Sequence, residues 1–253
     1  MKLSERCYAV TGLGYTAPWC VNAGFVVGDE TTLVLDTGAN WLAGATVHGY
    51  ASAVRPGNRM LVLNLEKHFD HIGGNGYFAE RGIEILGHTA CARTDAEFRA
   101  EKAEFNAAIP NATRRARGEA EAFYVNTRLT NPGRRIAEDT TLDLGGCAVE
   151  ILLTPGHTAT NLSAWVPAEG VLYAGDCLIS GYMPNLDAGG PEDWKTWLRS
   201  LERIAALAPR VMVAGHGAVT TGGDVQRMIR IVKAVLEGSV KAGVSPTAER
   251  GTV

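Results

Sequence analysis

The stretch Leu63-Asn-Leu-Glu-Lys-His-Phe-Asp-His-Ile-Gly-Gly-Asn75 carries four side chains that can bind a metal ion, directly after an apolar run. They are Glu66, His68, Asp70 and His71. We expect Glu66 and His68 to share one face of a strand, because residues two apart on a strand point the same way. Asp70 and His71 follow where this strand ends. Such a cluster can hold two cations side by side.

The composition indicates one substantial globular domain. The chain has 253 residues, of which 46% are hydrophobic, and we expect a single domain over residues 1–253. Its net charge of −3 offers no general attraction to nucleic acid or to an anionic membrane. No stretch reaches the roughly 18 consecutive apolar residues that a membrane span needs.

The N-terminus and the cysteines both point to the cytoplasm. Residues 1–7 contain no apolar segment of the kind found in signal peptides. The five cysteines are widely spaced and form no CxxC motif, which favours free thiols in a reducing compartment. We therefore predict a cytoplasmic protein, either a monomer or a homodimer.

The hydrophobic pattern predicts an α/β domain with two sheets and helices outside them. Strands are expected at residues 21–27, 31–36, 59–65, 83–87, 141–142, 148–153, 163–166, 171–174 and 210–214. Helices are expected at residues 42–54, 75–81, 194–207 and 225–236. Residues 93–125 are helical in character and read as an inserted helical layer or lid.

Three further motifs carry a histidine or an aspartate after an apolar strand, each beside a glycine. They are Thr154-Pro-Gly-His157-Thr158, Tyr173-Ala-Gly-Asp176-Cys177 and Val213-Ala-Gly-His216-Gly217. Binding residues gather on loops at strand ends, where a rigid scaffold holds them. Imidazole and carboxylate groups suit zinc, iron or manganese.

In their order and residue types these motifs resemble the metallo-β-lactamase-fold superfamily of metallohydrolases. The first motif of that family is H-x-H-x-D-H, and this chain has Glu66-Lys-His68-Phe-Asp70-His71. The turn Asp36-Thr-Gly38 also fits, and the resemblance runs from about residue 20 to about residue 220. It implies a four-layer αββα sandwich with metals at one edge of the two sheets.

The resemblance also implies a ligand set for two divalent metal ions. Glu66, His68 and His157 would hold one ion, Asp70, His71 and His216 the other, and Asp176 would bridge them. A water or hydroxide between the ions would be the nucleophile, because two metals can lower its pKa and polarise a carbonyl. Asp70 would be catalytic as well, by orienting this nucleophile. Asp36 is a candidate to fix the tautomer of a ligand imidazole.

Glu66 departs from the family pattern. Three carboxylates then face two divalent ions, which leaves one net positive charge where a histidine would leave two. Harder oxygen ligation shifts metal preference toward manganese or iron. We expect zinc in the first place, with iron or manganese as alternatives, and we predict altered metal selectivity or uneven occupancy of the two sites. In the competing interpretation, Glu66 points to solvent or to Lys67 and that metal has fewer protein ligands.

Several residues outside the motifs are candidates for the substrate pocket. Tyr15 and Trp19, with Cys20, lie in the loop before the first hairpin, and Tyr182 and Asn185 follow the strand that carries Asp176. Each could equally be an ordinary packing residue. Cys177 is expected to pack as a small buried hydrophobe.

The first functional hypothesis is a metal-dependent hydrolase that attacks the carbonyl of a small substrate such as a lactone, lactam or thioester. An antibiotic-degrading lactamase fits less well, because such enzymes are usually secreted. The alternatives are an iron-dependent redox enzyme of the same superfamily, and a nuclease, which would need more basic surface than residues 114–117 provide. A binding protein on a decayed scaffold is disfavoured, because six of the seven expected ligand types are retained. We expect no nucleic-acid and no membrane partner.

Overall fold

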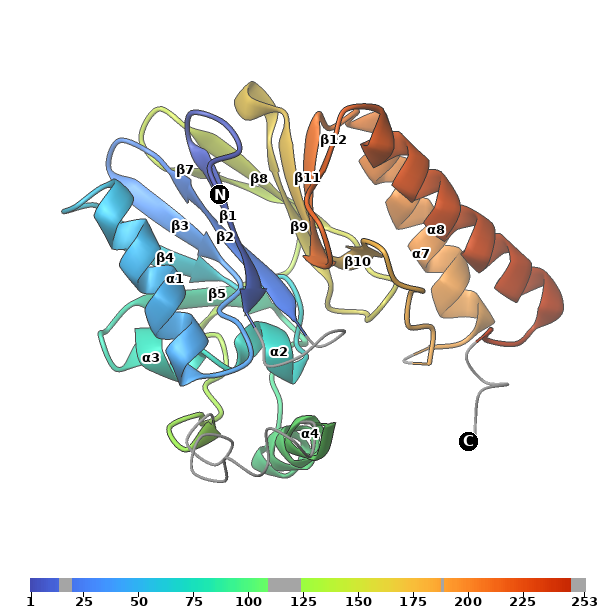
Figure 1. Cartoon of the computed structure of the whole chain (residues 1–253), viewed down its shortest axis with the longest axis horizontal. Helices are drawn as coiled ribbons and strands as arrows, with labels where there is room; N and C mark the ends of the chain where they lie inside the picture. The colour runs from blue at the N-terminus through green and yellow to red at the C-terminus, as the bar shows by residue number, and fades with distance from the viewer. Residues whose placement is uncertain (14–19, 109–123, 188, 247–253) are drawn as a thin grey trace.

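The computed structural model describes residues 1–13, 20–108, 124–187 and 189–246, without the side chains of residues 105–108. Figure 1 shows two β-layers facing each other, with α1 and α3 outside one of them and α7 and α8 outside the other. The predicted four-layer αββα sandwich is therefore confirmed. That residues 1–253 form a single domain stays a prediction.

The N-terminal layer is a mixed sheet. Strands β1, β2 and β3 are antiparallel, whereas β3, β4, β5 and β6 run parallel. The strands are β1 (Cys7–Leu13), β2 (Val21–Val27), β3 (Thr31–Leu35), β4 (Arg59–Leu63), β5 (Glu84–His88) and β6 (Arg134–Ile136). Helices α1 (Trp41–Val54) and α3 (Asn75–Ala79) cover its outer face.

The C-terminal layer has the helices α7 (Pro191–Ala206) and α8 (Gly223–Ala242) on its outer face. Its strands are β7 (Thr140–Asp143), β8 (Ala148–Leu153), β9 (Leu162–Val166), β10 (Val171–Ile179), β11 (Val211–His216) and β12 (Thr220–Thr221). A short 3-10 turn, η1 (Pro167–Glu169), precedes β10. One residue pair, Val21 with His216, joins β2 to β11. By hydrogen bonding the two expected sheets are therefore one continuous sheet that folds over itself.

Side-chain alternation explains why the inner strands are almost wholly apolar. In β4, Leu61 and Leu63 pack into the core between the two β-layers, whereas Val62 packs against the layer of α1 and α3. In β10, Tyr173 faces the same central core, and Leu172 faces the layer of α7 and α8. Both faces of these strands are buried, so both sets of positions must be apolar.

The predicted apolar stripe of residues 194–207 is confirmed in α7. Trp194, Trp197, Leu201 and Ile204 are buried against the second layer. The helix begins earlier than expected, because Pro191 can occupy its first turn, where the proline's missing N–H is not needed.

Three predictions about the strands and helices were wrong or incomplete. Strand β4 ends at Leu63, so Glu66 and His68 lie in a loop and strand alternation does not orient them. Strand β10 continues to Ile179, so Asp176 lies inside a strand and not after it. β1, β6, β12 and the one-turn helix α2 (Phe69–Ile72) were not predicted, because they are very short or, in β1, mix polar with apolar residues.

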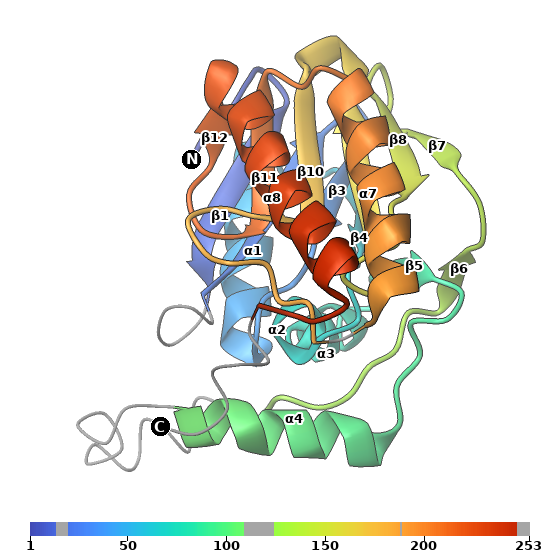
Figure 2. The same cartoon turned by 90° about the vertical axis from the view of Figure 1, so that its right-hand side faces the viewer.

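The inserted segment is described only in part. Its first half forms the helix α4 (Asp95–Ala108), as predicted, and Figure 2 shows α4 lying apart from the four layers. Phe98 of α4 packs on Phe69 of α2, with their ring centroids 4.8 Å apart. The basic residues Arg114, Arg115 and Arg117 lie outside the described residues. None of the described helices is both long enough and apolar enough to cross a membrane.

Candidate metal centre

Four segments that are far apart in the sequence bring the seven predicted ligands to one edge of the sandwich. Glu66 and His68 come from the loop after β4, and Asp70 and His71 from α2. His157 lies between β8 and β9. Asp176 lies in β10, and His216 is the last residue of β11.

The side chains fall into two groups of three. In the first group, Glu66, His68 and His157 each offer one potential metal-ligand atom, and these three atoms lie within 4.8 Å of one another. In the second group, the same holds for Asp70, His71 and His216. These are the two sets that the family resemblance implies.

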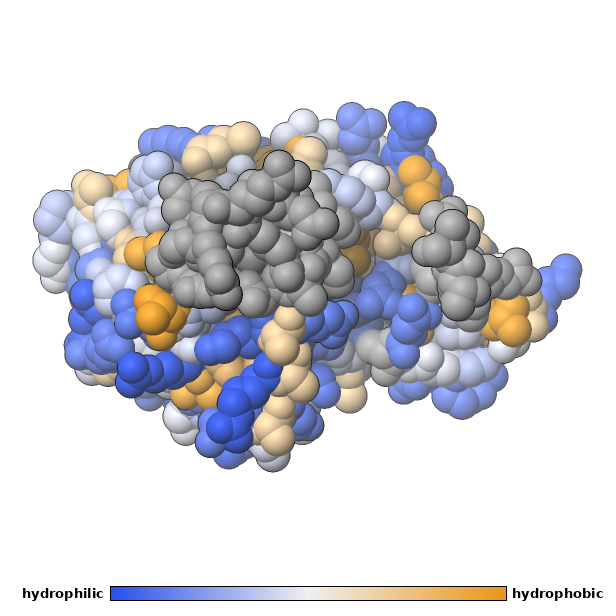
Figure 3. All heavy atoms as spheres, turned by 60° about the horizontal axis from the view of Figure 1, so that its bottom comes forward, coloured by the Kyte–Doolittle hydropathy of each residue, from blue (hydrophilic) through white to orange (hydrophobic). Residues whose placement is uncertain are grey.

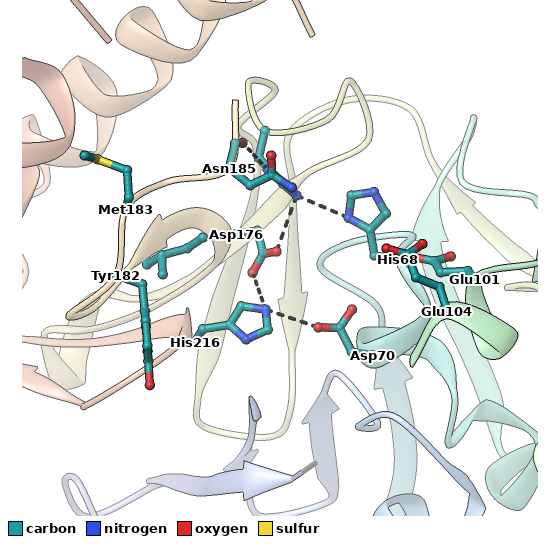
Figure 4. A pocket seen from close by; sticks show the side chains of 11 residues that line it. His68, Asp70, Glu101, Glu104, Asp176, Tyr182, Met183, Asn185 and His216 are labelled. Atoms are coloured by element: carbon teal, nitrogen blue, oxygen red, sulfur yellow. Dashed lines mark hydrogen bonds and ion pairs between the residues drawn. The ribbon is translucent and has the colours of Figure 1, made fainter. Parts of the chain in front are cut away.

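Asp176 contacts both groups. Its Oδ2 lies 3.4 Å from His157 Nε2. Its Oδ1 lies 3.2 Å from His71 Nε2 and 3.4 Å from His216 Nε2. Figure 4 shows Asp176 between His216 and His68, which belongs to the first group. A carboxylate in this place can contact two cations at once.

In three of the histidines, the Nδ1 atom, which points away from the centre, has a hydrogen-bond acceptor that sets the tautomer of the ring. His71 Nδ1 lies 2.8 Å from Asp36 Oδ2. His157 Nδ1 lies 3.1 Å from the carbonyl oxygen of Asn185, and His216 Nδ1 lies 3.1 Å from that of Cys20. These oxygens can only accept, so each Nδ1 carries the proton and each Nε2 lone pair faces the centre.

Glu66 is buried, so the interpretation in which it faces solvent is wrong. Thr158 Oγ1 lies 2.9 Å from Oε1 and 2.7 Å from Oε2, and the backbone N–H of Lys67 donates to Oε1 at 2.7 Å. The Thr158 hydroxyl in turn accepts from the backbone N–H of Thr160 at 3.2 Å. Glu66 is thereby held 3.8 Å from His68 Nδ1.

Steric constraints explain why glycine stands beside two of the candidate ligands. Gly175 has a φ of +53° and sits where the register between β10 and β11 shifts, so a bulge reorients Asp176. A Cβ at Gly215 would overlap Asp176 Oδ1 and the Gly175 backbone. The glycine directly before His216 therefore leaves the space that Asp176 occupies.

The charges of the centre are strongly coupled. Burial alone would lower the pKa of His71, but Asp176, Asp36 and Asp70 outweigh it and raise that pKa well above its usual value. Burial would also lower the pKa of His216, but Asp176 and Asp70 outweigh it and raise that pKa to about 11. In turn, the histidines outweigh burial and hold the pKa of Asp176 well below its usual value. The carboxylates thus favour positive charge here.

Two orphaned atoms test whether cations fit this donor set. His71 Nε2 and Asp176 Oδ1 lie 3.2 Å apart but not in hydrogen-bonding geometry, and both are among the few buried side-chain atoms of the described residues with no hydrogen-bond partner. Such orphaned groups are costly unless another partner is present. Both atoms face the second group, where a divalent cation would satisfy them. The residues therefore fit a metal centre.

A cavity of about 330 Å³ opens over the two groups. Asp70, Asp176 and His216 form its base, and the candidates Tyr182 and Asn185 line it. Figure 4 shows Glu101 and Glu104 on the side opposite Tyr182. Its volume lies within the usual range for small-molecule sites. The loops at this end of the sandwich belong to a mostly hydrophilic face with separate apolar patches (Figure 3). The candidates Tyr15 and Trp19 lie outside the described residues.

Sequence reasoning missed Glu101, Glu104 and Thr158. Glu101 Oε1 accepts the backbone N–H of Phe69 at 3.2 Å, at the start of α2, and its other oxygen pairs with Arg93. No local pattern in α4 predicts these contacts. Thr158, in contrast, directly follows His157, so its position in the motif could have identified it.

Cys177 is buried in the cluster between the second β-layer and α7 and α8, as expected for a small hydrophobe. Burial raises the pKa of its thiol to about 12. All five cysteines are free, which confirms that part of the prediction.

Replacing Asp36 with alanine is expected to weaken metal binding at the group of Asp70, His71 and His216 by about 10- to 100-fold. Asp36 Oδ2 holds His71, and Asp36 Oδ1 accepts the Leu65 backbone N–H at 2.7 Å. Competition titration with a chromophoric chelator measures the affinity. Asp143→Ala, at an exposed aspartate, is the control. Unchanged affinity in folded Asp36→Ala would contradict the assigned role.

Comparisons with known proteins agree with the geometry. A profile described as the metallo-beta-lactamase superfamily matches residues 17–216. The metallo-beta-lactamase type 2 of Bacteroides fragilis is 21% identical over 246 residues, covering 95% of this chain and 87% of that protein. The hydroxyacylglutathione hydrolase of Rhodospirillum rubrum is 26% identical over 158 residues, 61% of this chain. The chain spans about half (47%) of that hydrolase.

A solved structure shares the fold. The metallo-beta-lactamase FIM-1 from Pseudomonas aeruginosa, in its mono-zinc form, matches with a TM-score of 0.69 at 15% identity, over 95% of each chain. At this identity the likeness establishes the arrangement of the layers. The profile match covers most of the chain and includes all seven candidate ligands. The chain therefore belongs to the metallo-beta-lactamase superfamily.

Proposed function

We propose that this protein is a dinuclear-metal-dependent hydrolase that attacks the carbonyl group of a small substrate, such as a lactone, lactam or thioester. One observation carries the proposal: two groups of three potential ligands lie side by side, with Asp176 in contact with both. The superfamily relatives named as a metallo-beta-lactamase and as a hydroxyacylglutathione hydrolase support a hydrolase.

In the proposed centre, Glu66, His68 and His157 would hold one ion, and Asp70, His71 and His216 would hold the other. Asp176 contacts both. When bound, two such ions supply a hydroxide nucleophile at neutral pH and polarise the scissile carbonyl. The mono-zinc form of a relative with this fold supports zinc as the first metal to test. The buried carboxylate of Glu66 keeps iron and manganese as alternatives.

The chain's own residues have separate tasks. Asp36, Asn185 and Cys20 hold three imidazoles in the required tautomer through the contacts described above. Asp70 Oδ2 lies 3.2 Å from His216 Nε2, at the base of the cavity, where its carboxylate can accept a proton from the nucleophile and orient it. Tyr182 and Asn185 line the cavity and are the proposed contacts to the substrate.

Removal of metal is expected to abolish hydrolysis, and zinc is expected to restore it. The protein, dialysed against a chelator and reloaded with zinc, manganese or iron, is assayed on panels of esters, lactones, thioesters and β-lactams. We expect the metal-free protein to retain less than about 1% of the activity, because the described residues that line the cavity include no serine, threonine or cysteine that could replace a metal-activated hydroxide. Equal activity of metal-free and loaded protein would contradict the proposal. RNA cleavage or oxygen consumption without hydrolysis of any panel member would instead favour the nuclease or the redox enzyme.

A further inference from the structure

A second hollow of about 630 Å³ lies beside the catalytic cavity, between α8, β12 and the segment after β10. From α8 it is lined by Met228, Ile231, Val232 and Val235, which are spaced so that they share one face of the helix. Within the part of the chain that the structure describes, its charged lining residues are Asp224 and Arg227. We call this hollow the α8 groove.

The α8 groove adjoins the catalytic cavity. Ile179, Tyr182 and Met183 line both. Figure 4 shows the Met183 side chain pointing away from Asp70 and His216, toward the neighbouring helices. A ligand with its carbonyl over the metal centre could therefore extend past these three residues into the groove.

The groove exposes apolar side chains that a ligand could cover. Tyr182 is 45% exposed, Met183 52% and Ile231 55%. Covering apolar surface is favourable roughly in proportion to the area removed from water. An apolar part of a ligand suits this groove, since most of the side chains that line it are apolar.

We propose that the α8 groove binds the unbranched aliphatic chain of a carbonyl substrate, so that the preferred substrates are medium-chain acyl esters, thioesters or lactones. This inference rests on the proposed hydrolase function and narrows its substrate class. In this proposal the metal centre acts on the carbonyl group, and the groove selects the aliphatic chain that the carbonyl group carries.

A homologous series of 4-nitrophenyl esters, from acetate through butyrate, hexanoate and octanoate to decanoate, tests the proposal with the metal-loaded protein. The leaving group is constant, so differences report on the acyl chain. We expect kcat/KM to rise by about two- to fourfold for each methylene that the groove buries. A flat or falling series, with hydrolysis present, would overturn the groove and leave the hydrolase function standing.

Variants of groove residues test whether the chain-length preference depends on the α8 groove. Ile231→Ser places a hydroxyl in the groove at a surface position of α8, and Met183→Ser shortens the side chain at the junction. Each is expected to lower the ratio of kcat/KM for decanoate to that for acetate by at least about fivefold. Leu42→Ser, at a 53% exposed leucine on α1, is the matched control and should leave the ratio unchanged. An unchanged ratio in both groove variants would contradict the proposal.

Direct binding separates the two hypotheses if no ester is hydrolysed. Decan-1-ol, which has no group for the hydrolase to cleave, is titrated into the metal-loaded protein by calorimetry. Saturable binding with a negative heat-capacity change, weakened by Ile231→Ser and not by Leu42→Ser, would support the groove even if the hydrolase proposal fails. Absence of saturable binding would overturn the groove.

Discussion

Replacing Asp176 with asparagine is expected to lower kcat/KM of the metal-loaded protein by about a thousandfold or more. Asp176 is the one described side chain that contacts ligands of both groups, at 3.2–3.4 Å from His71, His157 and His216. The amide has nearly the same shape but no charge, and only one of its two polar atoms can contact a cation. The two ions would then lose their shared anionic ligand.

Steady-state kinetics and elemental analysis of the same preparations test this prediction. We expect the bound metal of Asp176→Asn to fall from two ions per chain toward one or fewer. Asp143→Asn, the same chemical change at an exposed residue of β7, should retain both the metal and the activity. An Asp176→Asn protein with two bound ions and activity within about tenfold of the parent would refute the bridging role.

Replacing Glu66 with histidine is expected to shift the metal preference toward zinc by about tenfold or more, measured as the zinc-to-manganese ratio bound at equilibrium in a chelator-buffered mixture. The substitution exchanges a hard carboxylate for an imidazole and removes one negative charge from the centre. The site is preorganised for the carboxylate, because Thr158 and the Lys67 backbone both bind it. The wild-type protein should therefore carry unevenly occupied sites when it is purified without added metal.

Two further variants isolate the cause. Glu66→Gln keeps the size of the side chain and removes its charge, and Thr158→Val keeps Glu66 but removes the hydroxyl that holds it. We expect Glu66→Gln to lower occupancy of the first group, and Thr158→Val to lower it less. Two fully occupied zinc sites in both the wild type and Glu66→His would show that Glu66 does not set metal identity.

The sequence predicted the fold and the candidate ligands because both depend on short local patterns. The runs at residues 21–27, 148–153 and 163–166 are apolar enough to require buried strands, and each is a strand. The metal-binding residue types recur in four motifs whose order is characteristic of the superfamily. For this reason the structure brings all seven predicted ligands to one edge.

Local patterns failed where geometry depends on distant segments. The strand expected to orient Glu66 ends at Leu63, so Glu66 lies in a loop. Its carboxylate is held by the hydroxyl of Thr158, which is 92 positions away in the sequence. Asp176 was expected after its strand, but a bulge at Gly175 turns it toward the histidines from within β10. The residues around Glu66 and Asp176 do not by themselves determine the direction in which either side chain points.

By itself, therefore, the sequence determined which side chains are available for metal binding and which layers bury the apolar strands, since residue type and alternation are local properties. Only the tertiary structure decided that Glu66 is buried and hydrogen-bonded, that Glu101 of the inserted helix holds the start of α2, and that an apolar groove adjoins the cavity. The first two features involve the loop after β4 and the contact of α4 with α2, and the third lies between α8, β12 and the segment after β10. Their contacts depend on packing across long stretches of chain and not on the spacing within any motif.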